Sequence, residues 1–191
     1  MKALFSRALL FLAALAVAAP LAAQDLYGTL KKIADSGVIT IGHRESSIPF
    51  AYLNDEQEAV GYSIDLCMRV VDKVKETLEM PDLEVRFVPV NPKTRIPLLA
   101  NGTIDIECGS TTNNLTRQQQ IDYAHTTFIT GTKLLVKKDA GITEVEDLDG
   151  KAIALAQGTT NERAIKAIVE AQGLDVDILP VRDHAEGFLT L

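Results

Sequence analysis

Residues 95–117 are Arg95-Ile-Pro-Leu-Leu-Ala-Asn-Gly-Thr-Ile-Asp-Ile-Glu-Cys-Gly-Ser-Thr-Thr-Asn-Asn-Leu-Thr-Arg117. Their pattern predicts a short helix over 96–101, closed by Gly102, and a buried strand over 104–106. The strand leads into glycine and three hydroxyl residues, and an arginine lies at each end of the stretch. Hydroxyls and free backbone N–H groups flanked by guanidinium groups can hold a carboxylate. No nucleophile with a base lies nearby, so the stretch favours a receptor for a small anion over a catalyst.

Strands and helices alternate on both sides of this stretch. Further strands are expected at 38–41, 85–90, 132–136, 151–156 and 177–181, and further helices at 27–36, 63–79, 116–124 and 162–172. A loose hairpin with a polar tip is expected between residues 50 and 62. Strands that alternate with helices predict an α/β fold, with a parallel or mixed sheet covered by helices.

The first 23 residues have the pattern of a cleaved export signal. Lys2 and Arg7 precede an apolar run over 8–19, which is shorter than the roughly 20 residues of a membrane-spanning helix. Loss of these two positive charges would change the formal charge from −7 to −9. An acidic exported protein is a poor candidate for binding nucleic acid or an anionic membrane surface.

The chain has two cysteines, Cys67 and Cys108. In an oxidising compartment a disulfide between them is the simplest expectation, and two buried free thiols are the alternative. The three histidines are far apart in the sequence and no CxxC or HExxH pattern occurs, so neither a metal site nor a cofactor is expected.

Five segments taken together resemble the periplasmic glutamate/aspartate-binding proteins of bacterial ABC uptake systems, within solute-binding protein family 3. They are Gly42-His-Arg-Glu-Ser-Ser-Ile-Pro-Phe50, Gly61-Tyr-Ser63, Arg95-Ile-Pro-Leu-Leu99, Asn101 to Asn114, and Gly158-Thr-Thr160. The likeness runs from about Thr29 to the last residue. It implies a two-lobed, hinged type II periplasmic binding protein that closes on one amino acid and delivers it to an ABC permease in the inner membrane.

The resemblance also implies how the chain is divided. Residues 24–128 would form lobe 1 and residues 129–191 part of lobe 2, with the crossing near 127–131. The return crossing and the last elements of both lobes are expected to be missing, as in a chain truncated at its C-terminus. The protein would be a monomer in the periplasm.

Seven residues are expected to bind the ligand by this resemblance: Arg44, Arg95, Ser110, Thr112, Arg117, Thr160 and His184. Arg117, Ser110 and Thr112 would hold the α-carboxylate, and Thr160 would offer a hydroxyl and a backbone N–H. Arg44 and Arg95 would grip the side-chain carboxylate. His184 would reach the same group from lobe 2, more strongly once protonated near pH 6.5.

Each of these residues also has a plain structural interpretation. Arg117 would be a solvated helix residue, Arg44 would pair with Glu45, and Arg95 would be a surface partner of an acidic residue. His184 would be an exposed side chain beside Asp183. The residues alone leave these alternatives open.

Two departures from the family pattern affect ligand preference. Pro92 stands where the family has a serine, so one hydrogen bond to the side-chain carboxylate is in doubt. The acidic partner of the ligand's ammonium is expected beyond Leu191, and Asp183 is the nearest local candidate. The preference between glutamate and aspartate therefore stays open.

Two other functions fit the same pattern. An enzyme on this fold, such as a dehydratase of small carboxylated substrates, would use Glu45 or Glu107 as a general acid. A soluble module that senses the ligand for a chemoreceptor or kinase is the third hypothesis.

Overall fold

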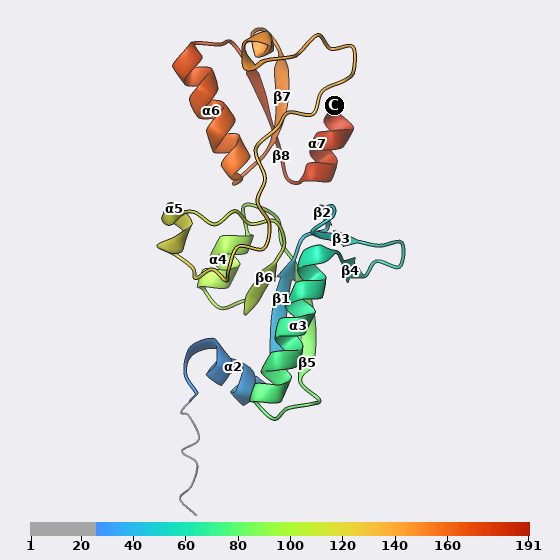
Figure 1. Ribbon diagram of the computed structural model, residues 1–191, viewed down its shortest axis with the longest axis vertical. Coiled ribbons are helices and arrows are strands. Elements are labelled where there is room, and N and C mark those ends of the chain that lie inside the picture. Colours follow the sequence, from blue (N-terminus) through green and yellow to red (C-terminus); the bar gives the residue numbers. More distant parts are fainter. Residues whose placement is uncertain (1–25) are drawn as a thin grey trace, which may run out of the picture.

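The computed structural model describes residues 26–191, and the expected export signal lies outside this range. Figure 1 shows two lobes that face each other along the long axis of the molecule. The elements from α2 to α5 form lobe 1, and β7, α6, β8 and α7 form lobe 2. The predicted α/β architecture with two lobes is confirmed. None of the helices within residues 26–191 is both long enough and apolar enough to cross a membrane.

The sheet of lobe 1 is parallel and places the first half of the site. Strand β1 (Val38–His43) lies between β5 (Glu84–Pro89) and β6 (Ile106–Cys108). In the register, Ile41 pairs with Phe87 on one side and with Ile106 on the other. Parallel strands bring their carboxyl ends to one edge, where open α/β sheets bind ligands. The residues that follow β1 and β6 therefore meet at that edge.

Four helices belong to lobe 1: α2 (Gly28–Ser36), α3 (Tyr62–Thr77), α4 (Arg95–Ala100) and α5 (Leu115–Gln118). The apolar face of α3 packs on the sheet, and its buried residues are Ile64, Cys67 and Val71. Cys67 and Cys108 form a disulfide with Cα atoms 6.2 Å apart, which joins α3 to the end of β6.

A small antiparallel sheet extends from lobe 1. It contains β2 (Ser46–Ser47), β3 (Ala51–Leu53) and β4 (Ala59–Val60). The turn between β3 and β4 is exposed and polar, so the predicted hairpin is confirmed. Gly61 follows with φ of 121°, and a Cβ there would lie 2.7 Å from the Phe50 carbonyl oxygen, so only glycine fits this approach.

Lobe 2 is built on a βαβ unit. After the 3-10 turn η1 (Val145–Leu148), β7 (Ala152–Ala156) leads through α6 (Thr160–Gln172) to the parallel strand β8 (Asp177–Val181). Thr159 caps α6 by accepting a hydrogen bond from the backbone N–H of Glu162. Helix α7 (His184–Thr190) follows β8 and points its first residues toward lobe 1.

The segment between the lobes differs from the expectation. The prediction of a strand over 132–136 is wrong, because residues 119–144 contain no helix or strand. A strand needs a neighbour that accepts its backbone hydrogen bonds, and no part of the described chain pairs with these residues. The helix expected over 116–124 is reduced to the single turn of α5.

Candidate ligand-binding site

The seven residues expected to bind ligand surround the place where the lobes meet. Arg44, Arg95, Ser110, Thr112 and Arg117 come from lobe 1, and Thr160 and His184 come from lobe 2. Hydrogen bonds cross the gap at both ends of this group. At one end the Thr112 and Thr160 hydroxyls lie 3.3 Å apart, and at the other Ser47 Oγ lies 3.2 Å from His184 Nδ1. The structure therefore gathers all seven where lobe 1 faces lobe 2, and this boundary is named the interlobe cleft.

Arg44 follows β1 and is fully buried, with 0% of its surface exposed. It pairs across the cleft with Asp183, with 2.6 Å between Nη2 and Oδ1 and 3.3 Å between Nε and Oδ2. Its Nη1 points to Ser110 Oγ at 3.5 Å. The alternative pairing with Glu45 does not occur, because the partner of Arg44 is a residue 139 positions away.

Asp183 stays ionised in this environment. Burial opposes its charge, but hydrogen bonds from the Ser46 hydroxyl and from Arg44 outweigh burial and lower its pKa. The backbone N–H of His184 also donates to its Oδ1. Because these donors occupy the carboxylate, Asp183 is poorly placed to bind the ligand's ammonium.

Arg117 lies on α5 and is 3% exposed, so it is not a solvated helix residue. Its Nη1 donates to the Thr112 carbonyl at 2.8 Å, and its Nη2 donates to the Gly158 carbonyl of lobe 2 at 3.0 Å. Asn114 caps the helix by accepting from the Arg117 backbone N–H. Burial lowers the pKa of Arg117 and the nearby Tyr123 opposes this effect.

Arg95 opens α4 and is also 3% exposed, which contradicts a surface location. Its Nε and Nη1 are buried and have no hydrogen-bond partner. The nearest carboxylate belongs to Glu107, whose Oε1 lies 3.9 Å from Nη1. Burial lowers the pKa of Arg95 to about 10, Glu107 opposes this shift, and repulsion from Arg44 and Arg117 adds to it. The guanidinium remains protonated at neutral pH and keeps free donors in the cleft.

The hydroxyl residues after β6 and on lobe 2 add neutral donors. Ser110 Oγ donates to Ser47 Oγ at 3.3 Å. Thr111 Oγ1 is buried and has no partner. Sequence reasoning missed Ser47, although it lies in the same segment as Arg44, because no local pattern indicates that its hydroxyl meets lobe 2.

His184 begins α7 directly after Asp183 and is exposed, as its plain structural interpretation expected. Desolvation of the imidazole and repulsion from Arg44 lower its pKa, and attraction to Asp183 does not compensate. The pKa of His184 therefore lies below 6.5, so the protonation that would strengthen the contact needs a lower pH than expected, and the ring is mostly neutral at pH 7. A neutral imidazole can still offer one N–H to a carboxylate.

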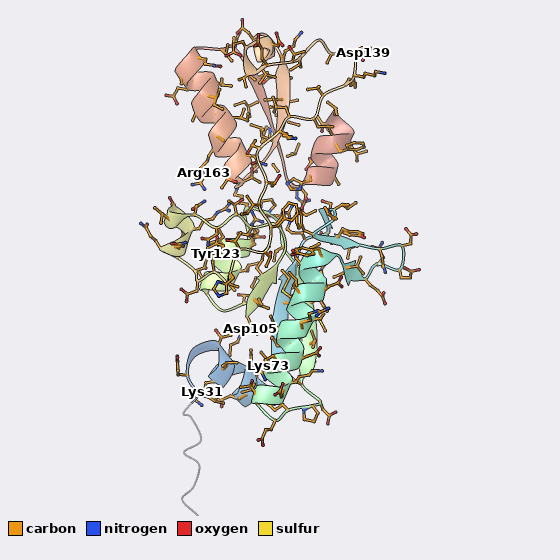
Figure 2. The ribbon with its side chains drawn as sticks, viewed as in Figure 1. Lys31, Lys73, Asp105, Tyr123, Asp139 and Arg163 are labelled. Atoms are coloured by element: carbon orange, nitrogen blue, oxygen red, sulfur yellow. A yellow bond between two sulfur atoms is a disulfide. The ribbon has the colours of Figure 1, made fainter. Side chains whose placement is uncertain are left out.

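Pro92 and Gly158 line a neighbouring hollow of about 320 Å³ between the lobes, together with Lys93, Arg117 and Arg163. Figure 2 shows Arg163 at the end of α6 that faces lobe 1. A Cβ on Gly158, where φ is 79°, would lie 3.0 Å from the Pro92 carbonyl oxygen. Glycine thus permits the lobe 2 loop to approach the Pro92 backbone closely.

Within residues 26–191 no group of His, Cys, Asp and Glu side chains could hold a metal ion.

Comparisons with known proteins identify the family of this chain. The family model of the bacterial extracellular solute-binding proteins, family 3, matches residues 39–186. An L-glutamate/L-aspartate-binding protein of Pseudomonas aeruginosa is 49% identical over 176 residues, which are 92% of this chain and 58% of that protein. A glutamate/aspartate import solute-binding protein of Escherichia coli is 45% identical over 183 residues, 93% of this chain and 61% of the relative.

A solved structure of another protein has the same fold as this chain. The crystal structure of an ancestral amino acid-binding protein, a precursor of cyclohexadienyl dehydratase, superposes with a TM-score of 0.73 at 27% identity and covers 85% of this chain and 68% of that one. The chain spans less than two thirds of the length of the curated relatives it matches. The matching family model and the two-lobed α/β fold lead to one conclusion: the chain belongs to the bacterial extracellular solute-binding proteins of family 3.

Proposed function

We propose that the protein is an exported solute-binding protein that captures L-glutamate and L-aspartate for uptake by an ABC transporter. The observation that carries this proposal is the presence of three buried arginines, Arg44, Arg95 and Arg117, around one interlobe cleft. Leaving a charged donor buried without a partner costs about 1–3 kcal/mol or more. Among the three arginines, Arg95 has two such donors, Nε and Nη1, and a ligand side-chain carboxylate would supply a charged partner for them, whereas the amide of a neutral amino acid would supply a weaker one. The relatives from Pseudomonas aeruginosa and Escherichia coli carry names with the same ligands.

We assign the two carboxylates of the ligand to opposite parts of the cleft. Arg117, Ser110, Thr112 and Thr160 would hold the α-carboxylate, and Arg44, Arg95 and His184 would hold the side-chain carboxylate. The unpartnered Nε and Nη1 of Arg95 are the donors most available to it. At Pro92, the departure from the family's serine, the side chain offers no donor.

The remaining parts of the proposal concern the protein as a whole. Residues 1–23 would direct export to the periplasm, lobe 1 would span 24–128, and lobe 2 would begin at 129. Ligand binding would favour the closed arrangement of the lobes, and the closed monomer would be recognised by the permease subunits. No cofactor takes part.

A non-enzymatic role is favoured over the dehydratase hypothesis. Glu45 is exposed, and Glu107 Oε1 lies 3.9 Å from Arg95 Nη1 without a hydrogen bond. Among the described residues, neither carboxyl group has the hydrogen-bonded partner that would position it as a general acid.

The test is calorimetric titration of the signal-free protein, in its full natural length, with L-glutamate, L-aspartate and L-glutamine. We expect both acidic ligands to bind, and Arg95→Gln to weaken glutamate binding by about 100-fold, as loss of one partner of a buried charge pair does. Arg86→Gln is the matched control, because Arg86 is exposed and its ion pair within residues 26–191 is with the exposed Glu84. Equal affinity for glutamine, or no binding of either acidic ligand, would overturn the assignment.

A further inference from the structure

Among the described residues, two carboxylates lie near the arginines of the cleft, those of Asp183 and Glu107. They differ in how many hydrogen bonds they accept. Asp183 accepts hydrogen bonds from Arg44, from Ser46 and from the backbone. Glu107, on β6, makes no hydrogen bond with its buried Oε1. Its side chain is nevertheless only 9% exposed. A buried carboxylate without such bonds acts on its surroundings chiefly through its charge.

Gly109 leaves room for the Glu107 side chain two positions earlier. A Cβ at position 109 would lie 2.5 Å from Glu107 Oε1 and 2.9 Å from Arg44 Cγ. The absence of a side chain at Gly109 therefore leaves space there for both the Glu107 carboxylate and the Arg44 stem. From there Oε1 is 3.9 Å from Arg95 Nη1, which is too far for a hydrogen bond but close enough for a strong charge interaction.

This placement has opposite consequences with and without a ligand. Without a ligand, the negative charge of Glu107 favours the protonated guanidinium: burial lowers the pKa of Arg95, Glu107 raises it, and repulsion from Arg44 and Arg117 lowers it further. When a ligand carboxylate approaches the free donors of Arg95, the same charge repels it. A like charge within about 4–6 Å disfavours a second ionised carboxylate by one or more pKa units.

We propose that Glu107 is a specificity-determining residue that stabilises the ligand-free cleft and limits its affinity for dicarboxylates through charge rather than contact. The proposal rests on the proposed function, since it takes an acidic amino acid as the ligand. It predicts that stability and affinity change in opposite directions when the charge is removed. If Glu107 merely positioned Arg95, its replacement would lower both the stability of the ligand-free protein and its affinity for the ligand.

The test is Glu107→Gln in the full natural protein, which keeps the shape of the side chain and loses no hydrogen bond of Oε1. We expect its dissociation constant for L-glutamate to fall by about tenfold, the effect of one nearby like charge. We expect the melting temperature without ligand to fall by about 2–4 °C, which corresponds to roughly 1 kcal/mol in a protein of this size. Affinity for L-glutamine should change less, so the preference for the acidic ligand should increase.

Glu56→Gln is the matched control, because it removes one negative charge from the exposed hairpin tip of the same lobe. If Glu107→Gln does not fold, Glu107→Asp retracts the charge by one methylene and should change affinity in the same direction, to a smaller extent. Weaker or unchanged glutamate binding in the folded variant, with binding by the wild type intact, would overturn the role of Glu107. Absence of acidic-ligand binding by the wild type would instead overturn the proposed function.

Discussion

The two lobes differ in how they are held together. Lobe 1 has a continuous hydrophobic core that runs from Ile33 in α2 to Cys108 in β6 and includes the fully buried Ile41. In lobe 2 the buried apolar residues are few, one each from η1, β7, α6 and β8 and none from α7: Leu148, Leu155, Ile165 and Val181. Large apolar side chains remain exposed there, among them Phe188 at 67% and Leu189 at 85%. Buried apolar area contributes about 25 cal/mol per Å², so lobe 1 has the greater internal stability.

The contacts between the lobes are of another kind. They include the ion pair of Arg44 with Asp183 and the hydrogen bonds of Ser46 with Asp183, Ser47 with His184, Thr112 with Thr160, and Arg117 with the Gly158 carbonyl. Polar contacts of this type exchange readily with water when surfaces separate. Lobe 1 is therefore stabilised by its own core, whereas lobe 2 is positioned against it mainly by polar groups. A ligand between the lobes would bind these same groups. We therefore expect lobe 2 to open at a lower free energy than lobe 1.

The largest expected effect concerns the disulfide of lobe 1. Cys67 and Cys108 are separated by 41 positions, and cross-links of this span stabilise by about 3–4 kcal/mol in the chain-entropy account. The double variant Cys67→Ala, Cys108→Ala should lose about this much free energy of unfolding. Urea denaturation measures the total loss, and hydrogen exchange resolved by peptide assigns it to lobe 1. A loss below about 1 kcal/mol would mean that packing alone maintains lobe 1.

A pair of core truncations compares the lobes directly. Ile41→Ala, in the central strand of lobe 1, should cost about 3 kcal/mol, because the surrounding core is closed and a cavity remains. Leu155→Ala, in β7 of lobe 2, should cost about half as much, since its neighbours are fewer and partly exposed. Each variant serves as the control for the other in the same denaturation experiment. Equal losses would show that lobe 2 is packed as tightly as lobe 1.

The smallest expected effect is a pH dependence at the interlobe contacts. The pKa of His184 lies below its ordinary value of 6.5 in the folded protein, so the unfolded chain binds more protons between the two values. The contribution of the neutral His184 to the free energy of unfolding is fully present above pH 6.5. It declines as the pH falls from 6.5 toward the pKa of His184 in the folded protein. His184→Gln should flatten this part of the stability curve between pH 7 and 5.

His125 provides the control for this titration, because it is exposed on the crossing segment. His125→Gln should leave the slope unchanged. Stability that rises as the pH falls from 7 to 5 would contradict the lowered pKa of His184. The lowered pKa of Asp183 acts in the same direction at more acidic pH, where protonation of its carboxylate would remove the partner of Arg44.

Local sequence patterns predicted most elements because they depend only on neighbours in the chain. The apolar spacing of residues 63–79 predicted α3, and the β-branched run over 38–41 predicted β1. Glycine at position 37 ends α2 in the left-handed conformation, as expected of a helix stop. The strand expected over 132–136 failed for the opposite reason, since a strand exists only where a partner strand is hydrogen-bonded to it.

By itself the sequence determined the α/β class, the family motifs and the residue types at the strand ends, because these follow from periodicity and spacing along the chain. Only the tertiary structure decided what the charged residues contact. It paired Arg44 with Asp183 rather than with Glu45, left two donors of Arg95 without partners, and placed Glu107 between two arginines. The physical reason is that charge interactions depend on distance and burial in space, and residues 139 positions apart in the chain can be 2.6 Å apart in the fold.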